Sequence, residues 1–283
     1  MVMNDKNDKN DPILYHYTDF IALDGILNGK VLRVNNVLNM NDSTEMALFV
    51  TGIFNAVEKR FANDKNEKMV NNVRSTRDHI LRHFYDYSMY AACFSEYRDD
   101  AAQWERYANR GKGVCLCFRK SALEKMSGGV IRLSKVSYQD NMESHPLVEE
   151  LYQYLQEHER PEYTFSQIEA VKEAWWNSAS FKHPSFSSEH EVRLILMPFA
   201  EPDFDLRPGY HVAGERIKKY YPLDLEQMCR NAQITIEDLI VELIVGPEST
   251  QSEPILRDYL QDLGLTRLSR HILRSSCPLR SKL

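Results

Sequence analysis

Residues 13–34 read ILYHYTDFIALDGILNGKVLRV, and this stretch decides the fold class. Its β-branched and aromatic start, residues 13–18, predicts a strand. Four apolar residues follow at helical spacing: Phe20, Leu23, Ile26 and Leu27. The Asn28-Gly29 pair predicts the end of that helix, and residues 31–34 predict a second, short strand. The chain therefore opens with a strand, a helix and a strand in close succession.

Two apolar stripes at helical spacing come next and predict a helical insertion at about residues 44–87. A polar turn at residues 39–43 precedes it, and Ser43 or Thr44 is the expected N-cap of its first helix. The first stripe consists of Met46, Val50, Ile53, Phe54, Val57 and Phe61. The second helix is expected from about Glu67 to Tyr85.

From Ser88 onward the apolar period changes to two, which predicts strands. Strand-like segments lie at residues 89–94, 113–118, 130–138, 191–197, 219–223, 239–245 and 271–273, with helical patterns around 147–157 and 165–180. These strands are too short and too irregularly spaced for a doubly wound parallel sheet. We therefore expect a disordered lead-in at residues 1–11, and then a single α+β domain over residues 12–283 around a strongly bent, antiparallel-rich sheet.

Composition narrows the function classes. The chain carries a net charge of −6 at pH 7, with 43% hydrophobic and 11% aromatic residues, as in an ordered globular protein. The charge gives no sign of a broad nucleic-acid-binding surface, although a local basic groove stays open as an alternative. No apolar run approaches the roughly 20 residues that span a bilayer, so no membrane partner is expected. The five cysteines are scattered, without a C-x-x-C pair, which predicts reduced thiols in a cytoplasm.

The common nucleotide, hydrolase and zinc motifs are absent from the sequence: G-x-x-x-x-G-K-[ST], G-x-G-x-x-G, G-x-S-x-G and H-E-x-x-H. Any nucleotide must therefore be held in another way. His79 and His83 stand four residues apart on an expected helix, but no third ligand accompanies them. No bound metal is expected.

The strongest local signal is Glu189-His190-Glu191-Val192-Arg193, which leads into an apolar strand. Two carboxylates at i and i+2 on a strand share one face, and like charges so close can raise the pKa of one of them. One acid would then suit proton chemistry, while an anionic one could stabilise an oxocarbenium-like transition state. The competing interpretation is a solvated strand end at which Arg193 balances the charge. Lys182 and Arg193 could meet a phosphate, or could form only ion pairs.

A second candidate is Tyr15-His16-Tyr17-Thr18, at the end of the first strand. A neutral imidazole can bond a ribose hydroxyl while a neighbouring ring stacks on a base. A half-buried histidine that is satisfied by the backbone is the simpler interpretation. Trp104 and Tyr107, three residues apart on a short helix, could form a stacking platform or belong to the core. Ser95 follows a buried strand and could position a sugar or cap a turn.

Taken together, these residues resemble a bacterial family, the domain of unknown function numbered 2971. The resemblance extends from Ile13 to Arg280. In order, it is carried by Tyr15-His16-Tyr17-Thr18, Ile26-Leu27, Gly29, Asn41-Asp42, Glu45, Cys93-Phe94-Ser95, Trp104, Tyr107-Ala108, Gly113-Val114, Phe118, Lys182, Glu189, Glu191 and Arg193. That family in turn is similar to the ADP-ribosyltransferase superfamily, whose fold is a split, bent, mixed sheet that clasps NAD. The resemblance implies a sheet of this kind, with helical insertions.

The resemblance also implies an active site. The superfamily combines a histidine or arginine on the first strand, a tyrosine or serine on the second and a glutamate on a later strand. The matching positions are His16, the region from Ala92 to Ser95, and Glu191. NAD is the implied substrate, with Glu191 and Glu189 catalytic and the following residues in contact with NAD: His16, Tyr17, Thr18, Ser95, Trp104, Tyr107, Lys182 and Arg193. Ser95, Tyr97 and Tyr107 compete for the position beside the nicotinamide.

The implied reaction cleaves the nicotinamide–ribose bond and transfers ADP-ribose to an unknown macromolecular acceptor. Glu189 would orient that acceptor, and such an activity suits a bacterial toxin or a phage-defence effector. An NAD glycohydrolase is an alternative on the same site. A non-catalytic nucleotide- or ligand-sensing module on the same fold is another, and a nuclease is disfavoured by the charge and by the lack of a metal set.

Overall fold

Strand β1 (Ile13–Thr18) lies inside a sheet because its side chains alternate between two apolar environments. Leu14 packs in the main core with the apolar side of helix α1 (Phe20–Leu27). Tyr15 and Tyr17 pack on the opposite face. This alternation follows from the period of two along a strand.

The computed structural model describes residues 11–40, 45–83, 86, 88–139, 141–157, 169–201, 203–213 and 215–279. Several expected features lie outside these residues: the lead-in at 1–10, Asn41-Asp42, the cap at Ser43 or Thr44, and the outer limits of the helical insertion at 44 and 87. Asp11, which the sequence assigned to the lead-in, is placed. Its carboxylate accepts a hydrogen bond from the backbone nitrogen of Ser121 at 3.1 Å.

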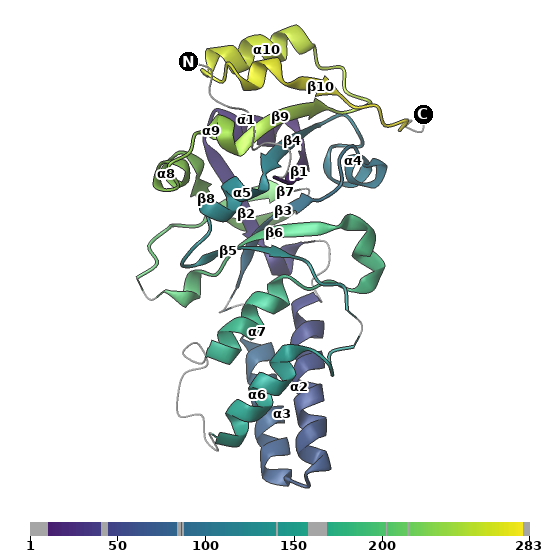
Figure 1. Ribbon diagram of the computed structural model, residues 1–283, viewed down its shortest axis with the longest axis vertical. Coiled ribbons are helices and arrows are strands. Elements are labelled where there is room, and N and C mark those ends of the chain that lie inside the picture. Colours follow the sequence, from purple (N-terminus) through teal and green to yellow (C-terminus); the bar gives the residue numbers. More distant parts are fainter. Residues whose placement is uncertain are drawn as a thin grey trace.

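The described strands form one mixed sheet, which confirms the predicted α+β class (Figure 1). They are β1, β2 (Val31–Asn36), β3 (Tyr90–Ser95), β4 (Val114–Arg119), β5 (Ile131–Lys135), β6 (Glu191–Leu196), β7 (Gly209–Ala213), β8 (Arg216–Asp224), β9 (Ile240–Val245) and β10 (Ile272–Arg274). Their order is β10-β9-β4-β1-β3-β2-β8-β7, with β6 attached to β3 and β5 to β6. The β9–β10 pair is parallel, and the other pairs are antiparallel.

The sheet opens between β1 and β3. One edge of β3 pairs with β6 along its whole length. The other edge pairs with β2 at Tyr90 and Ala91 and with β1 at Ser95 alone. Residues 92–94 therefore have no strand partner on that edge, because β1 turns away to pair fully with β4. β1 and β3 are therefore separated over residues 92–94.

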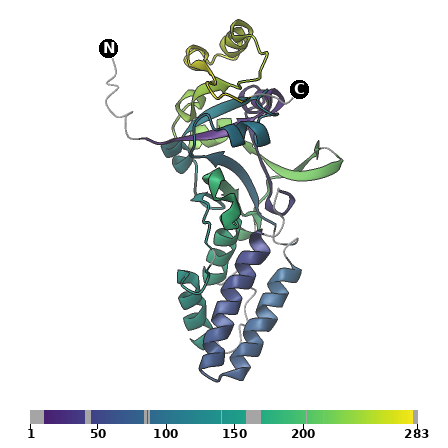
Figure 2. The ribbon, with the colours of Figure 1, turned by 90° about the vertical axis from the view of Figure 1, so that its right-hand side faces the viewer.

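The helices gather in two places. Helices α2 (Glu45–Asn63), α3 (Glu67–Arg82), α6 (Pro146–Glu157) and α7 (Glu169–Ala179) share one apolar cluster and extend away from the sheet (Figures 1 and 2). The sequence predicted an insertion of two helices, and the helical part is larger because α6 and α7 pack against α2. The others lie along the sheet: α4 (Ala101–Tyr107), α5 (Lys120–Lys125), α8 (Leu225–Asn231), α9 (Ile236–Leu239) and α10 (Glu253–Asp262). Among the described helices, none is both long and apolar enough to cross a membrane.

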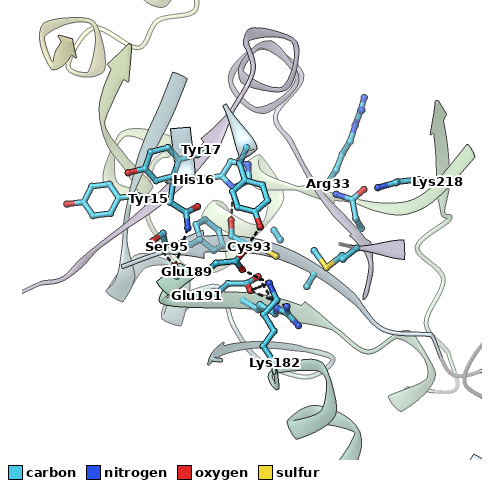
Figure 3. A pocket seen from close by; sticks show the side chains of 18 residues that line it. Tyr15, His16, Tyr17, Arg33, Cys93, Ser95, Lys182, Glu189, Glu191 and Lys218 are labelled. Atoms are coloured by element: carbon cyan, nitrogen blue, oxygen red, sulfur yellow. Dashed lines mark hydrogen bonds and ion pairs between the residues drawn. The ribbon is translucent and has the colours of Figure 1, made fainter. Parts of the chain in front are cut away.

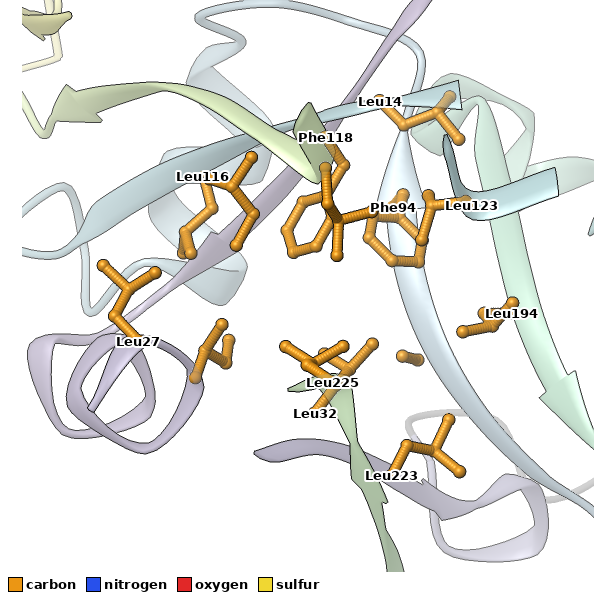
Figure 4. Packing of buried hydrophobic residues seen from close by; sticks show 14 of the residues in the cluster. Leu14, Leu27, Leu32, Phe94, Leu116, Phe118, Leu123, Leu194, Leu223 and Leu225 are labelled. Atoms are coloured by element: carbon orange, nitrogen blue, oxygen red, sulfur yellow. The ribbon is translucent and has the colours of Figure 1, made fainter. Parts of the chain in front are cut away.

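The main core fills the concave side of the opened sheet (Figure 4). Leu14, Phe94 and Phe118 come from β1, β3 and β4, and the rings of Phe94 and Phe118 meet edge to face at 5.1 Å between centroids. Leu32 and Leu223 add the neighbouring strands β2 and β8. This packing joins β1 to β3 where strand pairing does not, so it sets the width of the opening.

Gly113 permits a close approach between the end of β1 and the turn before β4. A Cβ atom at this position would lie 2.1 Å from the backbone oxygen of Thr18 and 3.0 Å from that of Ala108. We expect Gly113→Ala to lower the free energy of unfolding by about 1–3 kcal/mol, as overpacked sites do.

The control is Gly25→Ala, within α1, where no atom lies within 4 Å of the added Cβ. It should raise the free energy of unfolding by about 0.5–1 kcal/mol because alanine has the higher helix propensity. Urea unfolding curves measure both changes. A Gly113→Ala protein as stable as the wild type would contradict the close approach.

Candidate functional site

A cavity of about 230 Å³ occupies the opening between β1 and β3 (Figure 3). Side chains from β1, β2, β3, α4, β6 and β8 line it, together with the segment that precedes β6. The unpaired edge of β3, residues 92–94, forms part of its wall. The two strongest sequence candidates, His16 and Glu191, both face this cavity although they lie far apart in the chain.

His16 bridges the two strands at the opening. Its Nδ1 atom lies 2.8 Å from the carbonyl oxygen of Cys93. A carbonyl can only accept, so Nδ1 carries the proton and Nε2 keeps its lone pair. The imidazole packs beside the rings of Phe94 and Phe118, and its burial lowers the pKa of His16. A neutral imidazole with an acceptor nitrogen is therefore available at neutral pH.

Glu191 is held by two cations. Its carboxylate accepts hydrogen bonds from Nε and Nη2 of Arg193 at 2.9 and 3.1 Å, and Nζ of Lys182 lies 2.9 Å from its Oε2 atom. Glu191 is 5% exposed and Arg193 1%. Burial alone would raise the pKa of Glu191, but Arg193 and Lys182 outweigh it and lower the pKa to about 2. Glu191 is thus anionic at neutral pH. Its burial excludes the competing interpretation of a solvated strand end, although Arg193 does balance its charge.

Glu189 reaches the same lysine by another route. It ends a short 3-10 helix (Pro184–Glu189), and His190 then adopts a left-handed conformation with φ 44° before β6 begins. Oε1 of Glu189 accepts hydrogen bonds from Arg106 at 3.0 Å and from the Tyr107 hydroxyl at 2.8 Å, while Oε2 pairs with Lys182. The two acids therefore share Lys182 across a turn, and not as neighbours on one face of a strand.

Glu191 is the acid of the pair that stays anionic. Like charges can raise the pKa of one of two neighbouring acids, but at Glu191 the cations lower the pKa instead. Burial and Glu189 instead raise the pKa of Tyr107, so its hydroxyl stays protonated and donates to Glu189. The network gathers two carboxylates and three basic groups: Lys182, Arg193 and Arg106.

Ser95 lines the cavity but its hydroxyl is occupied. It donates to the backbone oxygen of Glu189 at 3.0 Å and accepts from the backbone nitrogen of Tyr97 at 3.1 Å. Gln103 donates to the same Glu189 oxygen at 3.3 Å. Together they fix the loop that carries Glu189.

Three further sequence candidates occupy different places. Tyr17 lines the cavity, yet its hydroxyl donates to the backbone oxygen of Tyr97 and accepts from the backbone of Asp100. Thr18 pairs with Val114 and is not among the residues that line the cavity. Trp104 is fully buried, and its indole nitrogen donates to Asp99 at 2.7 Å. The structure therefore offers no face of Trp104 to a ligand, and the aromatic residue of α4 at the cavity is Tyr107.

Sequence reasoning missed several residues of the site. Gln103 and Arg106 had a signal, because both share a helix face with Tyr107 at spacings of i, i+3 and i+4. Tyr138, whose hydroxyl accepts from the backbone nitrogen of Glu191 at 2.9 Å, had none. Arg33, Asn35 and Lys218 line the cavity from β2 and β8 without belonging to any motif.

The lowered pKa of Glu191 makes stability depend on pH. The folded value, about 2, lies below the ordinary value of 4.5, so ionisation of Glu191 stabilises the fold above pH 4.5. The contribution is lost as the pH falls towards 2, and a shift of this size corresponds to about 3 kcal/mol. We expect Glu191→Gln to lower the free energy of unfolding by about 3 kcal/mol at pH 7 but by roughly half of that at pH 3.

Urea unfolding at a series of pH values measures this difference. Glu173→Gln is the control, because Glu173 pairs with Arg132 in a half-exposed position, far less buried than Glu191. It should change the free energy of unfolding by less than about 1 kcal/mol. A gap between Glu191→Gln and wild type that stays constant from pH 7 to pH 3 would overturn the assignment of an anionic, cation-bound Glu191.

Comparison with known proteins found a family match over the middle of the chain. Residues 103–194 match the model of a family described as Protein of unknown function (DUF2971), which confirms the expected resemblance over this segment. No curated protein and no solved structure matches the chain. The matched segment begins at Gln103 and ends just after Arg193, so it contains the whole network around Lys182, while β1 with His16 lies outside it. The ion-pair network of this cavity thus belongs to the segment that is similar to DUF2971.

Proposed function

We propose that this protein binds NAD in the cavity between β1 and β3 and cleaves the bond between nicotinamide and ribose. One observation carries the proposal: His16 on β1 and Glu191 on β6 line the same cavity. The resemblance of the sequence to the ADP-ribosyltransferase superfamily supports it, because that superfamily combines a first-strand histidine with a later glutamate.

The chemistry of the donors suits the ribose of NAD. Nε2 of His16 keeps a lone pair that can accept a hydrogen bond from a ribose hydroxyl, since Nδ1 is already bonded to Cys93. Tyr107 lines the cavity beside the acids, with its hydroxyl bonded to Glu189. Basic side chains outnumber the two acids in the cavity wall, as an anionic dinucleotide requires.

Glu191 would stabilise the transition state of bond cleavage. As the bond between ribose C1′ and the nicotinamide nitrogen breaks, its electron pair leaves with nicotinamide and positive charge develops on the ribose. An anionic carboxylate that is already fixed by Arg193 and Lys182 needs no rearrangement to oppose that charge. The acceptor then bonds to C1′ and its proton passes to Glu189 or to water. A macromolecular acceptor makes the protein a transferase, and water makes it a glycohydrolase.

One observation favours a second candidate, a nucleotide- or ligand-sensing module without catalysis. Every carboxylate oxygen of the two acids already has a donor. Oε1 of Glu189 accepts from Arg106 and Tyr107, and Oε2 of Glu189 contacts Lys182. Oε1 of Glu191 accepts from Arg193, and Oε2 of Glu191 contacts both Arg193 and Lys182. A structural network of this kind would hold the cavity in shape for a ligand and leave its bonds intact. Release of nicotinamide distinguishes the two candidates.

In a bacterium, a transferase of this kind would act as a toxin or as a phage-defence effector in the cytoplasm. Its partners would be NAD and the macromolecule that receives ADP-ribose.

The test is release of nicotinamide from NAD, followed by chromatography. We expect Glu191→Gln to lower the rate at least about 100-fold, as removal of one electrostatic stabiliser does. The control is Glu242→Gln, which also removes a strand carboxylate from an arginine pair, with Arg98, but outside the cavity. The rate of this variant should stay within about twofold of the wild-type rate, a much smaller change than the roughly 100-fold loss expected for Glu191→Gln.

Circular dichroism at pH 7 shows that each variant is folded before its rate is compared. Wild-type protein that neither binds NAD nor releases nicotinamide would contradict the proposal, as would a Glu191→Gln protein of unchanged rate. Binding of NAD without release would support the sensing module.

A further inference from the structure

The cavity has a second end, remote from the acids. Arg33 and Asn35 of β2 and Lys218 of β8 line it there. Figure 3 shows Arg33 and Lys218 together on the opposite side of the cavity from Glu189, Glu191 and Lys182. These three residues take no part in the network around the acids.

Strand register explains why they meet. Asn35 of β2 pairs with Tyr220 of β8, so Arg33, Asn35, Lys218 and Tyr220 share one face of the sheet. The guanidinium of Arg33 lies over the ring of Tyr220, 4.9 Å from its centroid. On β7, His211 pairs with Lys218 and so faces the same way. Figure 2 shows the β7–β8 hairpin, in light green, projecting from the rest of the sheet.

Among the described residues, the positive charges at this end lack a carboxylate partner. Lys182 and Arg193 each contact a carboxylate in the cavity wall. In the part of the chain that the structure describes, neither Arg33 nor Lys218 has a carboxylate within ion-pair distance. Burial, followed by the positive charges of Arg33 and Lys218, lowers the pKa of His211. The local potential is therefore positive and would attract an anion.

One unsatisfied polar atom belongs to a residue of the cavity wall, and another lies on the neighbouring strand β7. Within the described residues, two buried side-chain atoms lack a hydrogen-bond partner, and they are Asn35 Oδ1 and His211 Nδ1. A buried acceptor without a donor costs free energy, so such atoms are usually bonded to something. Asn35 lines the cavity, so a ligand in the cavity can supply the donor.

We propose that this end is a subsite for a phosphate-bearing sugar. Arg33 and Lys218 bind the phosphate oxygens, and Asn35 Oδ1 accepts a hydrogen bond from a hydroxyl of the sugar. Two cations and one neutral acceptor on the same wall match a nucleoside phosphate better than a simple anion, which has no donor for Asn35. The assignment of this subsite to the ADP part of NAD rests on the proposed function. Binding of a nucleoside phosphate at the subsite does not require that NAD be cleaved.

Calorimetric titration with ADP and with adenosine tests the subsite. The wild-type protein should bind ADP at least about tenfold more tightly than adenosine, which lacks the phosphates. The loss of one charged hydrogen bond weakens binding by about this factor. Arg33→Gln and Lys218→Gln should each weaken ADP binding about tenfold and leave adenosine binding unchanged. Added salt should weaken ADP binding in the wild type.

The matched control is Arg216→Gln. Arg216 lies two residues before Lys218, on the same face of β8, but does not line the cavity. This variant should bind ADP as the wild type does. Arg33 is exposed and Lys218 half-buried, so their replacement spares the core, and thermal melting shows whether each variant is folded.

Two results would overturn the subsite: equal affinities of the wild type for ADP and adenosine, or wild-type ADP affinity in Arg33→Gln and Lys218→Gln. Its failure is separable from that of the proposed function. If ADP binds as expected while NAD releases no nicotinamide, the subsite stands and the proposed function fails. If the Arg33→Gln/Lys218→Gln double variant releases nicotinamide with an unchanged KM, the subsite fails and the proposed function stands.

Discussion

The hydrogen bond from His16 to the carbonyl of Cys93 is the interaction on which the cavity depends. Backbone groups of a buried strand need partners, and along residues 92–94 one edge of β3 has no strand beside it. At 2.8 Å, the imidazole takes the place of a backbone donor there. The side chain thus allows β1 and β3 to separate without leaving that carbonyl unpaired, and the space between them becomes the cavity. The same bond fixes the tautomer that faces a ligand.

The second constraint is electrostatic. Two carboxylates and the cations Lys182 and Arg193 are buried together, and taking ions out of water costs several kcal/mol for each. Well-packed apolar residues would make an equally stable core at lower cost, so stability alone does not account for the network. The oxygens and nitrogens of the network converge on a cavity wall. Buried charged groups at such a position commonly take part in binding or catalysis.

Local patterns predicted the local structure well. The residues of β1, α1 and β2 follow from period and capping alone, because each element contains its own signal. The packing of α6 and α7 against α2 was not predicted, because it brings together segments about 100 residues apart in the chain. The geometry of the acids was missed for a different reason: the i, i+2 rule assumes a continuous strand, and the left-handed His190 interrupts it. Arg33, Asn35 and Lys218 converge through strand register, which no motif records.

The two acids of the cavity are coupled through Lys182. The cations that keep Glu191 anionic also weaken its attraction for any further positive charge, because they lie within hydrogen-bond distance of the same oxygens. Arg193 is anchored to the backbone oxygen of Ala179 at 2.7 Å and keeps its place. Lys182 divides its ammonium group between both acids, so it fixes Glu189 and Glu191 relative to each other. A positive charge that reached this wall of the cavity would therefore meet a carboxylate that is rigidly placed but partly neutralised. In this wall, the preorganisation of the acid and the weakening of its charge have the same cause.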